Sequence, residues 1–317
     1  MIRQIRYWRR LVRWYFVSRS KQIASAFAVH RVPLSFIDRT AAGIVVKGTT
    51  LSVDSDNCQL IASSWQVLAA LIHAYSPVFS NSEPGRLTIQ IDEISLSIST
   101  FEEIVILGEV FGKRIYDLHS ANNVHVVDIG ANIGIATLFF ASRPWVSQVT
   151  AFELLWPTLE VARRNLELNP HLSPKVELRD YGLAANDRQV TLQYSPTWKG
   201  SIGITTAPTF VVNAPDLRIE TATLRRASEA FKELIAQGSQ PIIVKMDCEG
   251  AEYEILEDLA DSGVLKEIAA LIIEWHDRGP APLADLLLMN GYWIWTSRVE
   301  GTRDLGLLYA VAFVDPS

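Results

Sequence analysis

The sequence predicts an α/β protein built on a mostly parallel sheet, and three observations carry this prediction. Val124–Ile129 is a β-branched apolar run typical of a buried parallel strand, and a glycine turn, Gly130–Gly134, and an uncharged helical stretch, Ile135–Ala141, follow it. From Val124 onward, strands and helices alternate regularly, which indicates right-handed crossovers. Acidic residues repeatedly follow the apolar runs, so several carboxylates are expected at the edge of the sheet where ligands bind.

Residues 1–21 are predicted as a basic amphipathic helix. Their apolar side chains recur at helical spacing, and they carry seven basic residues and no acidic one, which leaves −13 for the rest of a chain whose net charge is −6. The run is too short and too charged to span a bilayer, and it lacks the features of a secretory signal. Two placements are open: the helix lies on an anionic membrane surface, or it docks on the acidic body of the protein or on a partner subunit. The stripe consists of Ile2, Ile5, Trp8, Val12, Tyr15 and Phe16.

Three further segments complete the predicted organisation. Residues 22–85 form an N-terminal extension with a helix over Ser63–Tyr75 and a linker or turn at Ser80–Gly85. Residues 86–120 hold a β-hairpin, Arg86–Ser99, and a helical approach, Phe101–Leu118, which either forms a lid over the cofactor cleft or packs on the sheet edge. Residues 121–317 form the α/β domain itself.

The α/β domain is expected to continue beyond the first strand with six more strands and four helices. Two extra extended pieces, Gln189–Tyr194 and Thr209–Val212, flank a polar loop, Lys199–Thr206. This loop is a candidate for selecting the substrate. The helices are expected over Pro157–Asn169, Leu224–Gln237, Ala251–Asp261 and Ala284–Asn290. The strands are expected over Val149–Phe152, Val176–Leu178, Ile242–Met246, Ala270–Glu274, Tyr292–Thr296 and Leu307–Val314.

The first strand and its turn favour S-adenosylmethionine over a dinucleotide. A dinucleotide fingerprint has three glycines, whereas this turn reads Asp128-x-Gly130-x-Asn132-x-Gly134. An aspartate would repel a pyrophosphate but attract the ammonium group of a methionine moiety. Glu153, which ends the next strand, can accept hydrogen bonds from both ribose hydroxyls, a role that nicotinamide and adenosylmethionine enzymes share.

Two positions at the end of the third strand are candidates for the adenine end of the cofactor. Asp180 could accept a hydrogen bond from the exocyclic amine, or it could simply be a solvated surface residue. Gly182 borders the same position.

A second group of polar residues is expected to face the acceptor. Asp247 and Glu249 end the fourth strand, and Glu274 and His276 end the fifth, so strand topology brings the four to one cleft, with the imidazole expected to be neutral. An alcohol is a poor nucleophile, so Asp247 or Glu249 could orient or deprotonate its hydroxyl; the alternative is helix capping and an ion pair with Lys245. The four could also ligate a divalent ion, but strand-end acids more often position polar substrates, so no metal is predicted.

Composition limits the classes of partner and compartment. A body that carries −13 outside its first 21 residues is a poor match for a nucleic-acid-binding surface, so no nucleic acid is expected. With Cys58 and Cys248 as the only cysteines, no disulfide framework is indicated. A cytoplasmic protein, peripheral at the inner face of the membrane if its first helix binds lipid, is therefore expected.

Taken together, these blocks resemble the FkbM family of methyltransferases. The resemblance rests on Val127–Gly134, Ala151–Glu153, Asn165–Asn169, Lys245–Glu252 and Ile272–His276, and it extends to the approach segment with Glu109 and Tyr116. There are two departures. Cys248 stands where the family usually has valine or isoleucine, and Arg225 stands where it commonly has aspartate.

The resemblance implies a class I methyltransferase fold, which is a Rossmann-like, seven-stranded, mostly parallel sheet with helices on both faces. It also implies S-adenosylmethionine as the cofactor and, typically, O-methylation of hydroxyls on sugars, glycolipids or secondary metabolites. Under this reading Asp128, Gly130, Asn132 and Gly134 hold the methionine moiety, and the acceptor is a small molecule or glycan. Two rival readings are a nicotinamide-dependent oxidoreductase and a non-catalytic, membrane-tethered scaffold that retains the fold.

Overall fold

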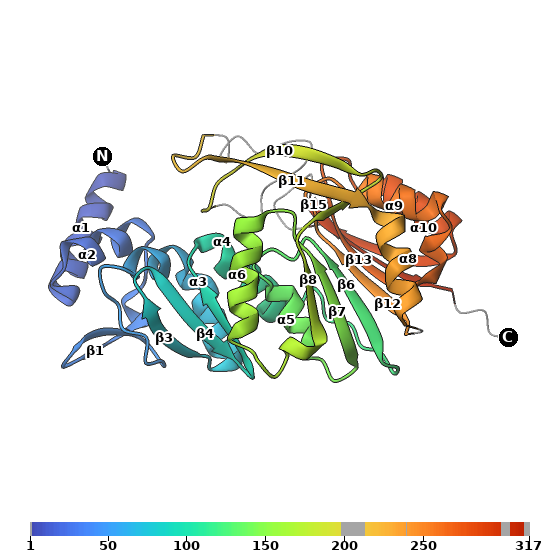
Figure 1. Cartoon of the computed structure of the whole chain (residues 1–317). Coiled ribbons are helices and arrows are strands. Elements are labelled where there is room, and N and C mark those ends of the chain that lie inside the picture. Colours follow the sequence, from blue (N-terminus) through green and yellow to red (C-terminus); the bar gives the residue numbers. More distant parts are fainter. Residues whose placement is uncertain (1, 198–212, 239, 299–304, 314–317) are drawn as a thin grey trace. The chain divides into compact units, whose positions relative to one another are not determined.

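The computed structural model describes residues 2–197, 213–238, 240–298 and 305–313, and the chain divides into two compact units (Figure 1). The first unit comprises Met1–Ile115 and the second comprises Tyr116–Ser317. Among the described residues, none of the helices combines the length and the apolar character needed to cross a bilayer.

The second unit is built on a seven-stranded sheet with the order β14-β15-β13-β12-β6-β7-β8. All neighbouring strands pair in parallel except β15, which runs antiparallel to both β13 and β14. The α/β fold with a mostly parallel sheet is therefore confirmed. The strands are β6 (Val124–Ile129), β7 (Val146–Phe152), β8 (Val176–Arg179), β12 (Ile242–Met246), β13 (Ile268–His276), β14 (Tyr292–Arg298) and β15 (Leu305–Ala312).

Helices cover both faces of this sheet. Figure 1 shows α5 (Ile135–Ala141) and α6 (Trp156–Glu167) on one face, and α8 (Ala227–Gln237), α9 (Glu252–Asp261) and α10 (Ala281–Met289) on the other. All seven residues of α5 are buried, which explains why this helix carries no charge. Because α5 follows β6 and α9 follows the adjacent β12, the crossovers change face between these two strands. This is the topological switch point at which doubly wound sheets bind ligands.

A smaller sheet with the order β10-β11-β9 packs against α8 through β11 and against α9 through β9. It also corrects one prediction. The segment Leu224–Arg226, predicted as the start of a helix, is the last part of strand β11 because its backbone pairs with both neighbouring strands. The helix begins only at Ala227. The predicted loop Lys199–Thr206 and strand Thr209–Val212 lie outside the described residues, as does the last residue of the predicted strand Leu307–Val314. The three strands are β9 (Gly182–Ala184), β10 (Arg188–Tyr194) and β11 (Arg218–Arg226).

The first unit combines helices with two small antiparallel sheets. The predicted hairpin is present as β4 and β5, but the predicted turn at Ser80–Gly85 is wrong for its first four residues. Residues up to Glu83 belong to β3, which pairs with β4 through a bulge, and only Pro84 and Gly85 form the turn. Polar residues form a strand here because β4 offers unpaired backbone groups. The elements are α1 (Ile2–Ser18), α2 (Lys21–Val29), β1 (Ile37–Thr40), β2 (Gly43–Val46), α3 (Cys58–Tyr75), β3 (Val78–Glu83), β4 (Arg86–Ile91), β5 (Ile94–Ile98), α4 (Phe101–Leu107) and a π-helical turn (Gly108–Lys113).

Candidate active site

The loops that follow β6 and β12 touch each other at the switch point. Gly130 has φ +81°, and a Cβ atom at this position would overlap the carbonyl oxygen of Asp247. The amide of Asp247 in turn donates a hydrogen bond to the carbonyl of Ile129 (3.0 Å). Glycine is therefore required at position 130 because the two loops approach closely and the backbone is left-handed. This contact places Asp247 directly beside the predicted cofactor loop.

A buried ion pair ties the same two loops together. The ammonium nitrogen of Lys245 lies 3.1 Å from Asp128 Oδ1 and donates a 2.7 Å hydrogen bond to the carbonyl of Gly130. Thr137 donates to the other oxygen of Asp128 (2.6 Å). Burial alone would lower the pKa of Lys245, but the charges of Asp128 and Asp247 outweigh it and raise the pKa, so Lys245 stays protonated.

This pairing changes what Asp128 can do. Its side chain is fully buried, and Lys245 already neutralises the carboxylate that was expected to attract the ammonium group of the cofactor. The described geometry gives Asp128 a positioning role: it holds Lys245, and Lys245 holds Gly130. The aromatic ring of Tyr116 lies 5.6 Å from the ammonium nitrogen of Lys245 and adds a cation–π contact.

Glu153 follows β7 and lies against the turn after β6. One carboxylate oxygen accepts from the amide of Asn132 (2.8 Å) and the other from the amide of Leu155 (2.8 Å), and the residue is 8% exposed. Burial raises the pKa of Glu153 to about 7, although both backbone donors and the charge of Lys245 act to lower it. A carboxylate has about four lone-pair sites, so each oxygen retains one for a further donor. This suits the two hydroxyls of a ribose.

The rest of the turn is shaped by left-handed backbone. Asn132 has φ +51° and Gly134 has φ +84°, and α5 begins directly after Gly134. The Asn132 side chain accepts from the amide of Ile133 (2.7 Å), and Asn165 of α6 donates to the carbonyl of Ile133 (2.9 Å). Asn165 therefore supports the turn from the neighbouring helix, which accounts for its place among the residues that carry the resemblance.

The two residues predicted near the adenine have different surroundings. Asp180 is exposed just after β8. Gly182 opens β9, and a Cβ atom there would lie 2.8 Å from a methyl group of Leu224, so a larger residue would have to displace the Leu224 side chain. Between them, the ring of Tyr181 is buried, and the guanidinium of Arg225 lies 4.3 Å from its centroid. Arg225, which departs from the family pattern, thus covers an aromatic ring.

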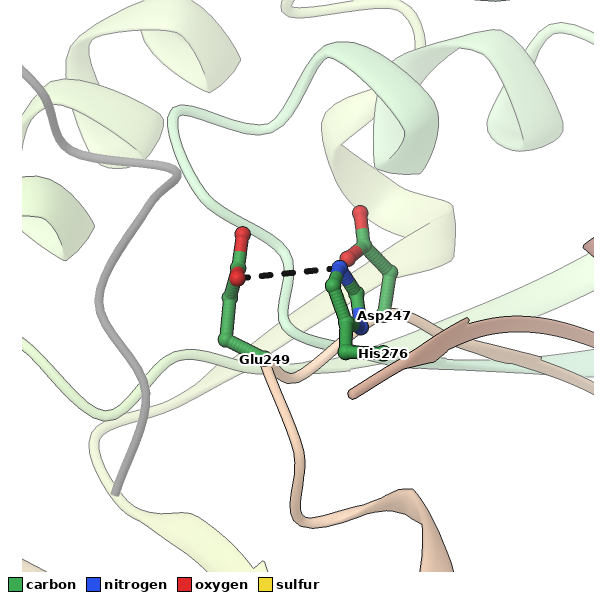
Figure 2. A group of neighbouring side chains, drawn as sticks. All are labelled: Asp247, Glu249 and His276. Atoms are coloured by element: carbon green, nitrogen blue, oxygen red, sulfur yellow. Dashed lines mark ion pairs between the residues drawn. The ribbon is translucent and has the colours of Figure 1, made fainter. Parts of the chain in front are cut away.

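Three of the four residues predicted to face the acceptor come together. One carboxylate oxygen or ring nitrogen from each of three residues, Asp247, Glu249 and His276, lies within 4.8 Å of the corresponding atoms of the other two (Figure 2). His276 Nε2 lies 3.6 Å from a Glu249 oxygen. Glu274 is not in this group; it accepts a hydrogen bond from the hydroxyl of Tyr116 (3.5 Å). Three of the four predicted residues therefore form one cluster, and Glu274 is directed toward Tyr116 instead.

Glu252, which sequence reasoning did not single out, organises this group. Its buried carboxylate accepts from the amides of Cys248 (3.1 Å) and Gly250 (2.9 Å) and lies 3.0 Å from His276 Nδ1. It therefore fixes both the loop that carries Glu249 and the imidazole ring. A glutamate in the first turn of a helix is commonly a cap, so the sequence alone does not reveal this role.

The expectation of a neutral imidazole at His276 is wrong. Burial by itself would lower the pKa, but the hydrogen bond to Glu252 and the charges of Glu249 and Asp247 raise the pKa of His276 to about 10. The ring is therefore protonated at neutral pH, with a carboxylate at each nitrogen. An imidazolium cannot ligate a metal, so a divalent ion at Asp247, Glu249 and His276 would have to displace this proton.

Lys245 is the other residue whose importance was underestimated. It lies within the buried strand β12, where a lysine needs a counter-ion. That signal was present in the sequence, but its partner, Asp128, lies on a different strand and could be identified only from the sheet order.

Comparison with known proteins gives a consistent picture. A family model described as the methyltransferase FkbM domain matches residues 128–292, slightly more than half of the chain. The methyltransferase sdnD of Sordaria araneosa is 29% identical over 244 residues, which cover 68% of this chain and 92% of that protein. The AMB antimetabolite synthetase AmbE of Pseudomonas aeruginosa is 31% identical over 206 residues, 53% of this chain and 9% of that much longer protein. The solved structure of methyltransferase FkbM from Methylobacillus flagellatus has a TM-score of 0.42 and 16% identity, and the match covers 80% of this chain and 60% of that one.

Proposed function

Because this chain belongs to the FkbM methyltransferase family and uses S-adenosylmethionine as its cofactor, we propose that it methylates a hydroxyl oxygen of a sugar, glycolipid or secondary metabolite. The observation that supports this acceptor is the position of Asp247: a partly exposed carboxylate whose backbone contacts the cofactor loop at Gly130. Similarity to part of an antimetabolite synthetase supports a small metabolite as the acceptor. Family membership does not favour the nicotinamide enzyme or the non-catalytic scaffold.

The residues around the turn fit the parts of this cofactor. Bound S-adenosylmethionine supplies an electrophilic methyl group on a sulfonium. Glu153 would accept hydrogen bonds from the ribose hydroxyls, Asn132 and Gly134 would border the methionine moiety, and Asp180 and Gly182 would border the adenine. Asp128 and Gly130 would act on the methionine moiety indirectly, through the shape of the turn.

The local charge also suits a cationic ligand. Asp128 and Lys245 cancel, whereas Asp247, Glu249 and Glu252 outnumber the single positive charge of His276. S-adenosylmethionine carries a carboxylate, an ammonium and a sulfonium, so its net charge is positive. A net negative site therefore attracts the cofactor and releases its neutral-sulfur product more readily.

On the acceptor side, Asp247 would act as the base. Bound S-adenosylmethionine would supply the methyl group, and the Asp247 carboxylate would take the proton that the acceptor hydroxyl loses when its oxygen is methylated. His276 cannot take this proton because it is already protonated; its charge instead holds Glu249 and stabilises negative charge that develops on the oxygen. Alignment of acceptor and donor is the other main contribution of the protein.

The test uses the full chain, deuterium-labelled S-adenosylmethionine and a panel of hydroxylated acceptors, with products identified by mass spectrometry. In Asp247→Asn, Glu249 and Glu252 still outnumber His276, so cofactor affinity should be largely kept, while transfer should slow by about 10²- to 10⁴-fold, the usual contribution of a positioned base. Asp261→Asn, an exposed aspartate at the end of α9, is the matched control. Unchanged turnover in Asp247→Asn, or a product methylated on nitrogen or carbon, would contradict the proposal.

A further inference from the structure

Within the first unit, helix α1 packs against α2 through one face, and Arg39 also donates to the carbonyl of Phe16 near the end of α1 (2.7 Å). Trp14 is 2% exposed, its ring packs edge-on against Phe27 of α2 at 4.7 Å, and its indole nitrogen donates to the carbonyl of Val32 (3.2 Å). Arg10 donates to the carbonyl of Ala28 (3.0 Å). The contacts of Trp14 and Arg10 lie along the side of α1 that faces α2, so they determine which side of the helix points away from it.

The opposite side of α1 is apolar and exposed to solvent. At 100° per residue, the five side chains of this side fall within one stripe about 100° wide. A contiguous exposed stripe of this size marks an interaction surface rather than ordinary surface variation. The stripe consists of Ile5 (48% exposed), Trp8 (59%), Val12 (51%), Tyr15 (41%) and Phe16 (60%).

Positive charge borders this stripe. Arg6, Arg9 and Arg13 are exposed on the flank next to Ile5 and Phe16, and no acidic residue occurs in residues 1–21. Their spacings of three and four residues place like charges side by side, which destabilises a helix in water. An anionic partner would relieve this repulsion.

A groove extends the apolar surface toward α2. It is a cavity of about 360 Å³ lined by Tyr7, Leu11, Val12, Tyr15 and Ala24, with Lys21 also in its lining. Val12 and Tyr15 belong to both the groove and the stripe, so the two surfaces are continuous. An open groove with apolar walls can accept a flexible acyl chain, whereas the flat surface of another protein would leave the groove unfilled.

From these features we propose that α1 binds the surface of an anionic membrane. The stripe enters the boundary between headgroups and acyl chains, and the flanking arginines contact lipid phosphates and carboxylates. A second copy of this chain fits less well, because pairing two such stripes would bring two sets of arginines together. This inference is independent of the methyl-transfer proposal.

The first experiment measures sedimentation of the full chain with vesicles. We expect binding to vesicles of phosphatidylcholine mixed with phosphatidylserine, weak binding to phosphatidylcholine alone, and release by high salt. The double variant Trp8→Ser, Phe16→Ser should lose binding. The control is Trp293→Ser, because this tryptophan is 68% exposed but lies in the other unit. Unchanged circular dichroism in all variants excludes unfolding as the cause.

The second experiment tests the charge. The triple variant Arg6→Gln, Arg9→Gln, Arg13→Gln should lower the partition coefficient onto anionic vesicles by about a hundredfold, since each basic residue near such a surface contributes about a factor of five. The control removes the same charge from exposed residues of the second unit: Arg164→Gln, Arg218→Gln, Lys266→Gln.

Either of two results would overturn the proposal. One is that the intact chain fails to sediment with anionic vesicles, or that the control variants lose as much binding as the α1 variants. The other is a concentration-dependent dimer in light scattering that the Trp8→Ser, Phe16→Ser variant abolishes, which would assign the stripe to self-association.

Discussion

The buried carboxylate of Glu153 is expected to lower the stability of the folded chain at neutral pH. The same carboxylate is expected to bind the cofactor. Its pKa is about 7 in the folded protein, against an ordinary value of 4.5, because burial disfavours its charge. At about 1.4 kcal/mol per pH unit, ionising this carboxyl costs the folded state about 3 kcal/mol. Between these two pKa values, the folded protein keeps a proton on Glu153 that the unfolded chain releases. The stability that the protonated carboxyl contributes is therefore fully present below pH 4.5 and is lost as pH rises through about 7.

The substitution Glu153→Gln isolates this effect. The glutamine has one oxygen, so it can accept from either Asn132 or Leu155 but not from both, which costs about 1–3 kcal/mol at every pH. It removes the ionisation cost only where the wild-type residue would be charged. Relative to wild type, the variant should therefore gain about 3 kcal/mol of unfolding free energy between pH 4 and pH 8.

Urea denaturation at a series of pH values measures this difference, with the exposed Glu167→Gln as the control. Calorimetry should show that Glu153→Gln binds S-adenosylmethionine at least tenfold more weakly, since a hydrogen bond to a charged group contributes about 1.5–3 kcal/mol. Wild-type affinity should rise with pH up to about 7 and then level. A stability difference that does not change with pH, or unchanged affinity, would refute the reasoning.

Three further outcomes follow from the same site. Lys245→Met should lower the unfolding free energy by about 3–5 kcal/mol because it leaves Asp128 charged and buried, and the double variant with Asp128→Asn should recover part of this loss in urea denaturation. Gly130→Ala should abolish cofactor binding in calorimetry, whereas Gly263→Ala, with a similar φ of +75° and open space around it, should cost only about 1–2 kcal/mol of stability. The ring protons of His276 should titrate near pH 10 in NMR spectra; because this pKa is raised, the imidazolium stabilises the fold below pH 6.5 and is lost through pH 10. A titration near pH 6.5 would show that His276 is largely neutral at pH 7 and would contradict the charge assigned to it.

The fold was predictable because its signals are local. The apolar run Val124–Ile129, the turn Gly130–Gly134 and the regular alternation that follows identify a parallel sheet without knowledge of any contact. The errors arose where backbone pairing overrides local preference: Leu224–Arg226 has helical composition but belongs to β11, and Ser80–Glu83 reads as a turn but pairs with β4.

The proximity of three candidate residues was predictable from the sequence, whereas the full membership of the cluster and its electrostatics were not. Strand ends collect at one edge of a parallel sheet, so the proximity of Asp247, Glu249 and His276 could be inferred from their positions in the chain. The direction of each side chain could not, and Glu274 contacts Tyr116 instead of joining them.

By itself, then, the sequence determined the class of fold, the family and the edge of the sheet at which the candidate residues gather, because these depend on periodicity and on motifs of a few residues. Only the tertiary structure decided the charge states of Lys245 and His276. Lys245 on β12 neutralises Asp128 on the neighbouring strand β6. Glu252, at the start of α9, keeps His276 at the end of β13 protonated. A pKa depends on burial and on charges within a few ångströms, and those neighbours are brought together by folding rather than by adjacency in the chain.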